Sequence, residues 1–212
     1  MKAEFLIDYC RQAEWLRQEG QRQSPIDIET SQIETDAHLS NIQVNFSTTP
    51  ATFFNNGQNL QLLGAGEAYL NNRCFQFVQM HFHTDSEHQL DGQTFPLEGH
   101  FLFQAPNGQQ AVIGVFYQIG AANPDFEQVL KQYEQQGDGV CSLARLLPEN
   151  KSYYHYIGSL TTPPLTEGVE WYVLQTSLTV SEKQLARFIA IHGRNKRLCQ
   201  PLNSRKVLSY NE

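Results

Sequence analysis

The sequence predicts a mainly β protein of the α+β class, with one mixed sheet and short helices at its periphery. Short runs in which apolar and polar residues alternate recur along most of the chain, separated by Asn-Gly, Asp-Gly and Gly-Ala-Gly turn signals. Helical spacing of apolar residues is confined to three short stretches. At 212 residues the chain is long enough to bury a substantial core. All-β domains of this length commonly stay single, so we expect one domain over residues 1–212.

The first part of the chain begins with a helical stretch and continues as strands. From Ala3 to Glu19 apolar residues fall at rough helical spacing, which predicts an amphipathic helix that ends at Gly20. Gln23 to Ile28 is predicted to be extended, because the residue before Pro25 is pushed out of the helical region. Between Ile42 and Leu70 turn residues interrupt short alternating runs, which predicts strands joined by hairpins.

The later part of the chain predicts two more strands and two helices. Ala111 to Gln118 is an apolar run bounded by turn residues, as expected of a buried strand. Pro124 to Gln136 has apolar residues at helical spacing and should form a surface helix. Val169 to Gln175 is predicted to be another strand. Ser181 to Ile191 should be another helix, with Ser181 as its N-cap.

The most informative stretch, Phe75 to Phe103, holds four of the seven histidines and is predicted to form two strands joined by a turn at Asp91-Gly92. On the first strand strict alternation predicts one shared face for five residues, namely Phe75, Phe77, Gln79, His81 and His83. On the second strand, Pro96 to Phe103, the same alternation predicts that Glu98, His100 and Leu102 share one face. Antiparallel pairing would therefore bring three imidazoles to one point.

Three neutral imidazoles with an open fourth position are typical of a catalytic zinc site. Gln79 and Glu98 each lie two residues before a histidine on the same face, where they are placed to accept the second N–H of a ligand ring. The plainer alternative is a chance His-x-His pair and a hydrogen-bonded core histidine. Polar residues that face inward on phenylalanine-rich strands need partners, however, and a metal satisfies several of them at once.

Composition excludes several classes of function. A net charge of −7 without a basic cluster argues against a nucleic-acid partner. The sequence contains no run of 18 apolar residues, so we expect no membrane span. Met1 to Cys10 has acidic residues where a secretion signal has its apolar core, so we expect a cytoplasmic protein. The alternative is a periplasmic protein whose signal peptide has been removed. Four well-separated cysteines allow two disulfides or free thiols, at Cys10, Cys74, Cys141 and Cys199.

A second informative stretch, Tyr156 to Trp171, contains Thr-Thr-Pro-Pro, where two prolines force an extended loop and two hydroxyls precede them. Alone it would be an ordinary surface loop. Together with five other motifs it makes the chain resemble the α-class carbonic anhydrases, in the compact form typical of bacterial members. The motifs are Q-S-P-I-D-I (23–28), N-N-G (55–57), Q-M-H-F-H-T-D-S-E-H (79–88), L-E-G-H (97–100), G-S-L-T-T-P-P-L-T-E-G-V-E-W (158–171) and Q-P-L-N-S-R (200–205).

This resemblance implies a large, mostly antiparallel central sheet of about ten strands, with zinc at the bottom of a conical cleft. It also implies a lyase that hydrates carbon dioxide reversibly to bicarbonate and a proton through a zinc-bound hydroxide. The expected partners are these small molecules, with no nucleic acid and no membrane, and a homodimer is left open. Residues 1–20 are atypical of the family.

The resemblance also assigns residues to roles. It implies that His81, His83 and His100 bind zinc, and that Gln79 and Glu98 accept their outer N–H groups. Thr161 is expected to accept a hydrogen bond from the hydroxide and to donate one to Glu87. Carbon dioxide is expected against an apolar wall formed by Leu102, Val112, Leu160 and Trp171, with Thr162 on the bicarbonate side.

The chain departs from the family at three places. The proton-shuttle histidine is replaced by Gln58, which cannot change its protonation state, so slow turnover is expected. The two cysteines that often form a disulfide in bacterial relatives are replaced by Arg17 and Leu165, which favours a reducing compartment or a lineage that lost the bridge. The N-terminal aromatic segment has no clear counterpart, although Tyr9 or Trp15 is a candidate to replace its tyrosine.

Two rival functions are weighed against this assignment. His81, His83 and Glu87 also fit the cupin spacing H-x-H-x-x-x-E, which would make Glu87 a ligand of iron or manganese. The cupin glycine is missing, since Phe75 stands in its place, and no second cupin motif follows. The other rival is a carbonic anhydrase-like binding module without catalysis, but such proteins usually lose a zinc histidine.

Overall fold

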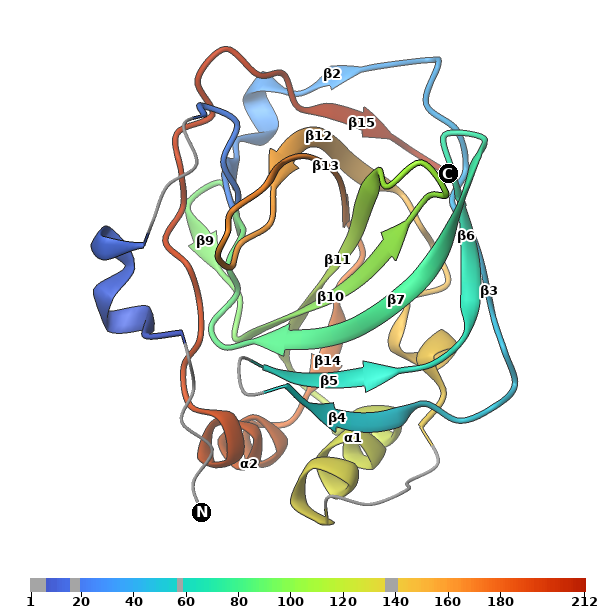
Figure 1. Cartoon of the computed structure of the whole chain (residues 1–212), viewed down its shortest axis with the longest axis vertical. Helices are drawn as coiled ribbons and strands as arrows, with labels where there is room; N and C mark the ends of the chain where they lie inside the picture. Colours follow the sequence, from blue (N-terminus) through green and yellow to red (C-terminus); the bar gives the residue numbers. More distant parts are fainter. Residues whose placement is uncertain (1–6, 16–19, 57–58, 136–140) are drawn as a thin grey trace.

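Twelve strands form one large mixed sheet in the computed structural model, which describes residues 7–15, 20–56, 59–135 and 141–212 (Figure 1). The strands are β2 (Glu34–Thr35), β3 (Gln43–Phe46), β4 (Thr52–Asn55), β5 (Leu60–Leu63), β6 (Gly66–Leu70), β7 (Arg73–His83), β10 (Leu97–Gln104), β11 (Gln110–Ile119), β12 (Tyr153–Ser159), β13 (Glu167–Leu174), β14 (Leu178–Val180) and β15 (Leu208–Tyr210). The prediction of a mainly β fold is confirmed. The sheet has twelve strands rather than about ten.

The main path of the sheet runs β2-β15-β12-β13-β11-β10-β7-β5-β4, and β3, β6 and β14 pair beside it. Most neighbouring strands are antiparallel, but β11 pairs in parallel with β13 and β14, and β15 with β2, so the sheet is mixed. A second, small sheet consists of β1 (Asp27–Ile28), β8 (Gln89–Leu90) and β9 (Gln93–Thr94). The last two strands flank the predicted Asp91-Gly92 turn, where both residues have positive φ.

Short helices lie at the periphery, as the sequence predicts. The α-helices α1 (Pro124–Gln135) and α2 (Glu182–His192) lie side by side at one end of the sheet (Figure 1). Ser181 caps α2, since its hydroxyl accepts from the Gln184 amide while the Gln184 side chain accepts from the Ser181 amide. In the described part of the chain, three 3₁₀ helices span Tyr9–Glu14, Thr30–Gln32 and Leu143–Leu146. None of the helices described is long and apolar enough to cross a membrane.

A bulge in β7 corrects the predicted face of the first histidine strand. Phe77 pairs with Phe103 and Gln79 pairs with Leu102, so Val78 is an extra residue between them. An inserted residue reverses the alternation of side chains along the strand. Phe75 and Phe77 therefore point into the same apolar core as Met80, Phe82, Phe101 and Phe103, not to the side of the histidines. The prediction that they share the histidine face is wrong.

The sheet separates two apolar clusters, and the histidines lie on the side of the smaller one. The larger cluster fills the space between the sheet and the two α-helices, with Phe82, Phe126 and Phe188 in ring contact. The smaller cluster includes Val112 and Trp171. The bulge thus lets one strand contribute phenylalanines to the larger core and histidines to the opposite face.

The N-terminal segment differs from the predicted amphipathic helix. Its described part forms only a short 3₁₀ helix, in which Arg11 lies outside helical geometry at φ −113° and ψ 29°. The helix ends at Glu14, before an extended Trp15, so Gly20 does not end it. The Gln12 side chain bonds to the backbone of residues 196 and 198, and these tertiary contacts explain why the local helical spacing fails as a guide. Residues 3–6 and 16–19 lie outside the described part.

Candidate metal centre

Three histidines from two neighbouring strands meet at one point on the sheet. His81 and His83 lie on β7, and His100 lies on β10 directly opposite His81. One ring nitrogen from each lies within 4.8 Å of the other two. All three side chains are at least nine-tenths buried. The antiparallel pairing therefore brings the three predicted ligands together. Among the described residues, this group of ligand atoms consists of histidine nitrogens and includes no carboxylate.

The outer nitrogen of each ring has its own hydrogen-bond acceptor. His81 Nδ1 lies 2.9 Å from Gln79 Oε1, and His100 Nε2 lies 2.9 Å from Glu98 Oε1. His83 Nδ1 lies 2.7 Å from the backbone oxygen of Asn195. Acceptors at these atoms hold the proton on the outer nitrogen, which leaves the lone pairs of His81 Nε2, His83 Nε2 and His100 Nδ1 for a ligand.

A divalent metal fits this donor set. His83 Nε2 is buried and has no hydrogen-bond partner among the described residues, a costly state for a polar atom. Burial, followed by the charges of the other two rings, lowers the pKa of His81 well below its usual value. Burial likewise lowers the pKa of His83 and of His100. The rings are therefore neutral at neutral pH, the form in which imidazole binds zinc.

Glu98 connects the metal centre to a buried hydrogen-bond chain. Its Oε1 lies 2.8 Å from His88 Nδ1, and its Oε2 accepts from the backbone N–H groups of Glu87 and His88 at 2.8 and 2.9 Å. Burial acts to raise the pKa of Glu98, but His88 and His100 hold it well below its usual range. His88 Nε2 in turn lies 2.7 Å from Tyr156 Oη, which lies 2.7 Å from Ser24 Oγ.

Glu87 lies beside the histidines without being one of the gathered ligands. Its Oε1 accepts from the Arg197 backbone N–H at 2.7 Å, and its Oε2 is 3.9 Å from His100 Nδ1. Burial raises the pKa of Glu87 well above its usual value, against the opposite influence of the nearby Thr161 hydroxyl and the Arg197 amide. This arrangement gives no support to the cupin assignment, in which Glu87 would bind the metal.

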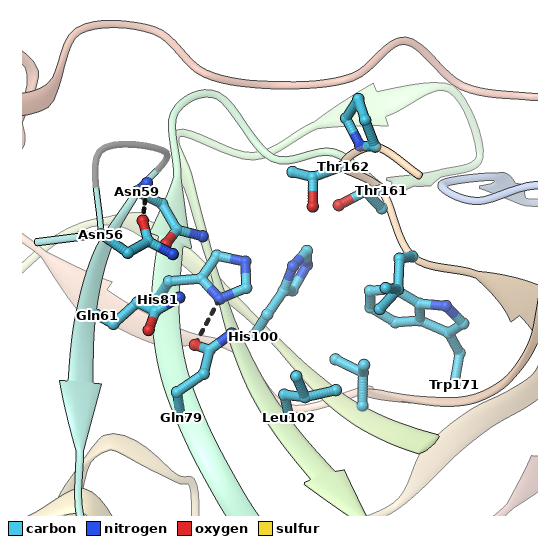
Figure 2. Close-up of a pocket in the computed structure, with 13 residues that line it drawn as sticks. Asn56, Asn59, Gln61, Gln79, His81, His100, Leu102, Thr161, Thr162 and Trp171 are labelled. Atoms are coloured by element: carbon cyan, nitrogen blue, oxygen red, sulfur yellow. Dashed lines mark hydrogen bonds between the residues drawn. The ribbon is translucent and has the colours of Figure 1, made fainter. Parts of the chain in front are cut away.

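A cavity of about 210 Å³ opens onto the histidines. Figure 2 shows amide side chains on one side, apolar side chains on the other, and the rings of His81 and His100 between them. The amide side consists of Asn56, Asn59, Gln61 and Gln79, and the apolar side of Leu102, Val112, Leu160 and Trp171. Thr161, Thr162 and Pro163 complete the lining. All five residues predicted to contact substrate therefore line the same cavity.

Sequence patterns do not assign a role to some residues of this site. His88 is the last residue of the motif at 79–88, so the sequence does carry a signal for its place beside Glu98. The carbonyl of Asn195 had none, because a backbone atom far along the chain leaves no side-chain pattern. Asn59 directly precedes β5 and Gln61 lies on it, and the alternating pattern of this strand gives no reason to place either residue in the cavity.

The three predicted departures from the family have different outcomes. Gln58 and Arg17 lie outside the described residues, whereas Leu165 is buried and all four cysteines are free thiols. Of the two aromatic candidates, Tyr9 is the one that the charge of a site residue reaches. Its hydroxyl is buried, and burial together with the charge of Glu87 raises its pKa. The Trp15 indole instead donates to the Asp8 carbonyl at 3.1 Å.

Comparisons with known proteins agree with this geometry. Residues 10–211 match the family model of eukaryotic-type carbonic anhydrases. A carbonic anhydrase of Pectobacterium carotovorum is 37% identical over 198 residues, covering 89% of this chain and 80% of the relative. One from Nostoc sp. is 34% identical over 206 residues, covering 91% and 77%.

Solved structures give the same result. The α-carbonic anhydrase of Thermovibrio ammonificans in complex with the inhibitor sulfanilamide is similar, with a TM-score of 0.82, 37% identity and coverage of 89% and 87%. A dioscorin complexed with ascorbate also has a TM-score of 0.82, at 30% identity and coverage of 91% and 87%. The chain therefore belongs to the eukaryotic-type, or α-class, carbonic anhydrase family and is an enzyme of that class.

Proposed function

We propose that the chain binds one zinc ion through His81, His83 and His100 and catalyses the reversible hydration of carbon dioxide to bicarbonate and a proton. The observation that supports this most strongly is the unpartnered, buried Nε2 of His83 among three neutral imidazoles. Zinc, when bound, supplies the Lewis acidity for which carbonic anhydrases are the standard example, and so makes a nucleophile from water at neutral pH.

Glu87 and Thr161 orient the reacting oxygen in this proposal. The Arg197 amide donates to Glu87 Oε1, and Glu87 Oε2, which is buried and has no hydrogen-bond partner among the described residues, is the acceptor that the proposal assigns to the Thr161 hydroxyl. A hydroxyl that donates in one direction has only lone pairs to offer in the other. Thr161 therefore accepts from ligands that carry a proton and disfavours those that carry none. This selects the orientation of the nucleophile before substrate arrives.

The two sides of the cavity suit the two species of the reaction. Carbon dioxide is uncharged and weakly electrophilic, so it needs a dry surface and not a charged clamp. Leu102, Val112, Leu160 and Trp171 supply that surface. Trp171 is held in place because its indole N–H donates to the Ser159 carbonyl at 2.9 Å. Bicarbonate is polar, and the proposal assigns it to the side of Thr162.

Metal analysis combined with a hydration assay tests the proposal. Purified protein should contain one zinc per chain, lose hydration activity when zinc is chelated and recover it when zinc is restored. His100→Ala should lose both zinc and activity, whereas His38→Ala, at an exposed histidine, should lose neither. A zinc-loaded parent protein without hydration activity would contradict the proposed reaction. Retention of zinc and activity by the His100→Ala protein would contradict the ligand assignment.

A binding module without catalysis is the second candidate, because a dioscorin complexed with ascorbate is among the similar structures. This second candidate would be favoured if the purified protein binds zinc but does not hydrate carbon dioxide. A homodimer and a cytoplasmic location stay predictions. Sedimentation of the purified protein and fractionation of its native cells would test them.

A further inference from the structure

The segment 195–198 supplies two backbone hydrogen bonds to the candidate metal centre. The carbonyl of Asn195 accepts from His83 Nδ1 at 2.7 Å, and the N–H of Arg197 donates to Glu87 Oε1 at 2.7 Å. Neither bond depends on the side chain at its position. The orientation of the peptide groups around residue 197 therefore decides where the carboxylate of Glu87 is held.

Gln12 binds the same segment through both ends of its side-chain amide. Its Nε2 donates to the carbonyl of Lys196 at 2.9 Å, and its Oε1 accepts from the N–H of Leu198 at 2.9 Å. One amide thus pairs with the carbonyl before Arg197 and with the N–H after it, while the N–H of Arg197 itself is directed to Glu87. In an extended segment the backbone N–H and C=O groups point alternately to the two sides, and a neighbouring strand usually binds those on one side. Here the Gln12 side chain makes the hydrogen bonds that such a strand would make.

The N-terminal 3₁₀ helix brings Gln12 to this position. Gln12 Nε2 also donates to the carbonyl of Tyr9 at 2.9 Å, which fixes the side chain to its own helix. The helix lies beside the C-terminal part of the chain that contains residues 195–200 (Figure 1). Tyr9 lies on the same helix, within reach of the charge of Glu87, and its buried hydroxyl has no hydrogen-bond partner among the described residues. One short element therefore reaches the surroundings of Glu87 from two positions.

We propose that Gln12 is a positioning residue, which fixes the peptide groups on either side of Arg197 and so holds the Arg197 amide against Glu87. Through Glu87 it acts on Thr161, and in this respect the inference rests on the proposed function. It goes beyond that function because it assigns a role in the site to the N-terminal segment, the part of the chain in which the resemblance offered no counterpart.

Other contacts make a clean test possible. The Arg197 guanidinium donates to Gln23 Oε1 at 2.9 Å and to the Ser24 carbonyl at 2.6 Å, and the backbone N–H of Gln200 donates to the Pro25 carbonyl at 2.8 Å. These bonds keep the segment attached when Gln12 is replaced. Gln12→Ala should therefore loosen the peptide groups at 196–198 without unfolding the protein or removing zinc.

The experiment compares three variants of the zinc-loaded protein. Gln12→Ala removes both bonds, and Gln12→Glu keeps the acceptor for the Leu198 amide while its carboxylate loses the donor to Lys196. Arg11→Ala is the matched control, because the neighbouring Arg11 is exposed and pairs with Glu14 in its own helix. For each, amide hydrogen exchange is measured at residues 197 and 198, and kcat/KM is measured as a function of pH.

In Gln12→Ala, exchange at both amides should rise by about tenfold, because a local opening becomes easier when hydrogen bonds are removed. kcat/KM should fall by about three- to tenfold and its pH profile should shift. Zinc content should not change. Gln12→Glu should keep the Leu198 amide protected, and Arg11→Ala should match the parent in every measurement.

Unchanged exchange in Gln12→Ala would overturn the inference. Faster exchange with an unchanged pH profile would also overturn it, because Gln12 would then tether the N-terminal segment without positioning Glu87. A parent protein that lacks hydration activity would instead contradict the proposed function. In that case exchange at the Arg197 amide still decides whether Gln12 holds this amide.

Discussion

The carboxylate of Glu98 accepts a hydrogen bond from the ring of His100 at 2.9 Å, although the two residues belong to the same strand. Residues two apart on a strand point to the same face, so β10 itself supplies both the expected ligand and its acceptor. The bond places the proton of His100 on Nε2 and leaves Nδ1 for the metal. His88 and two backbone N–H groups bind the same carboxylate and fix its orientation.

Glu98→Ala should weaken zinc binding by roughly ten- to a hundredfold, as the loss of an acceptor behind a ligand does. The His100 ring would lose the bond that fixes its tautomer and its orientation. Competition with a chromogenic chelator measures the affinity. Glu34→Ala is a suitable control, because Glu34 lies at the surface and pairs with Lys206. Equal zinc affinity in the Glu98→Ala protein and the parent would show that Glu98 does not support the metal.

Thr161→Ala should lower the rate of carbon dioxide hydration by about a hundredfold while zinc is retained. The hydroxyl lies beside the buried carboxylate of Glu87 and lines the cavity, but it is not among the gathered metal ligands. Thr161→Ser keeps the hydroxyl and should stay close to the parent. Stopped-flow hydration and metal analysis give the two readings. An alanine variant within twofold of the parent would mean that Thr161 does not orient the reacting oxygen.

The sequence predicts the histidine cluster well because the information is local. His81, His83, Gln79, Glu98 and His100 lie on two strands joined by one hairpin, so alternation and pairing bring them together without knowledge of the remaining fold. Alternation fails only at Val78. A bulge depends on how β7 fits between β10 on one side and β5 and β6 on the other, and this fit has no local signature.

The features that sequence patterns do not predict depend on backbone atoms far away along the chain. The Asn195 carbonyl and the Arg197 amide come from a segment more than a hundred positions from their partners. The 3₁₀ helix at Tyr9–Glu14 is decided by contacts with that same segment, which override the helical spacing. The sequence patterns do not predict strand β12, although it is rich in aromatic residues, because its last residues run directly into the Thr-Thr-Pro-Pro loop motif.

Stability at alkaline pH should depend on the buried thiol of Cys141. Burial, and next the charge of Asp125, raises the pKa of this thiol from 9.0 to about 12. The folded protein therefore holds the proton where the unfolded chain releases it. The contribution of the protonated Cys141 thiol to the free energy of unfolding is complete below pH 9. It is lost as the pH rises toward 12, by up to about 1.4 kcal/mol per pH unit.

Denaturant unfolding at pH 8, 9 and 10 measures this effect before most tyrosines ionise. The free energy of unfolding of Cys141→Ala should fall less steeply with pH than that of the parent. Cys10→Ala is the control, since Cys10 is exposed, and should keep the parental slope. Equal slopes for all three proteins would show that the Cys141 thiol ionises at the same pH in the folded and unfolded states.

The last prediction concerns the route by which the proton leaves. Each hydration releases one proton, and in carbonic anhydrases generally the acid at zinc has a pKa of about 7. A diffusional ceiling of roughly 10^10 M⁻¹ s⁻¹ for reprotonation, multiplied by an acid constant of about 10⁻⁷ M, permits on the order of 10³ releases per second to water. Fast carbonic anhydrases reach about 10⁶ s⁻¹, so a group that titrates near neutral pH must carry the proton.

The resemblance to the family assigns the position of that group to Gln58, and an amide does not titrate in this range. We therefore expect slow turnover limited by buffer, with imidazole-type buffers raising kcat and leaving kcat/KM nearly unchanged. Gln58→His should raise kcat in dilute buffer and flatten its dependence on buffer concentration. Gln93→His, at an exposed position of β9, should do neither. Turnover of the parent near 10⁶ s⁻¹ in dilute buffer would mean that another group already carries the proton.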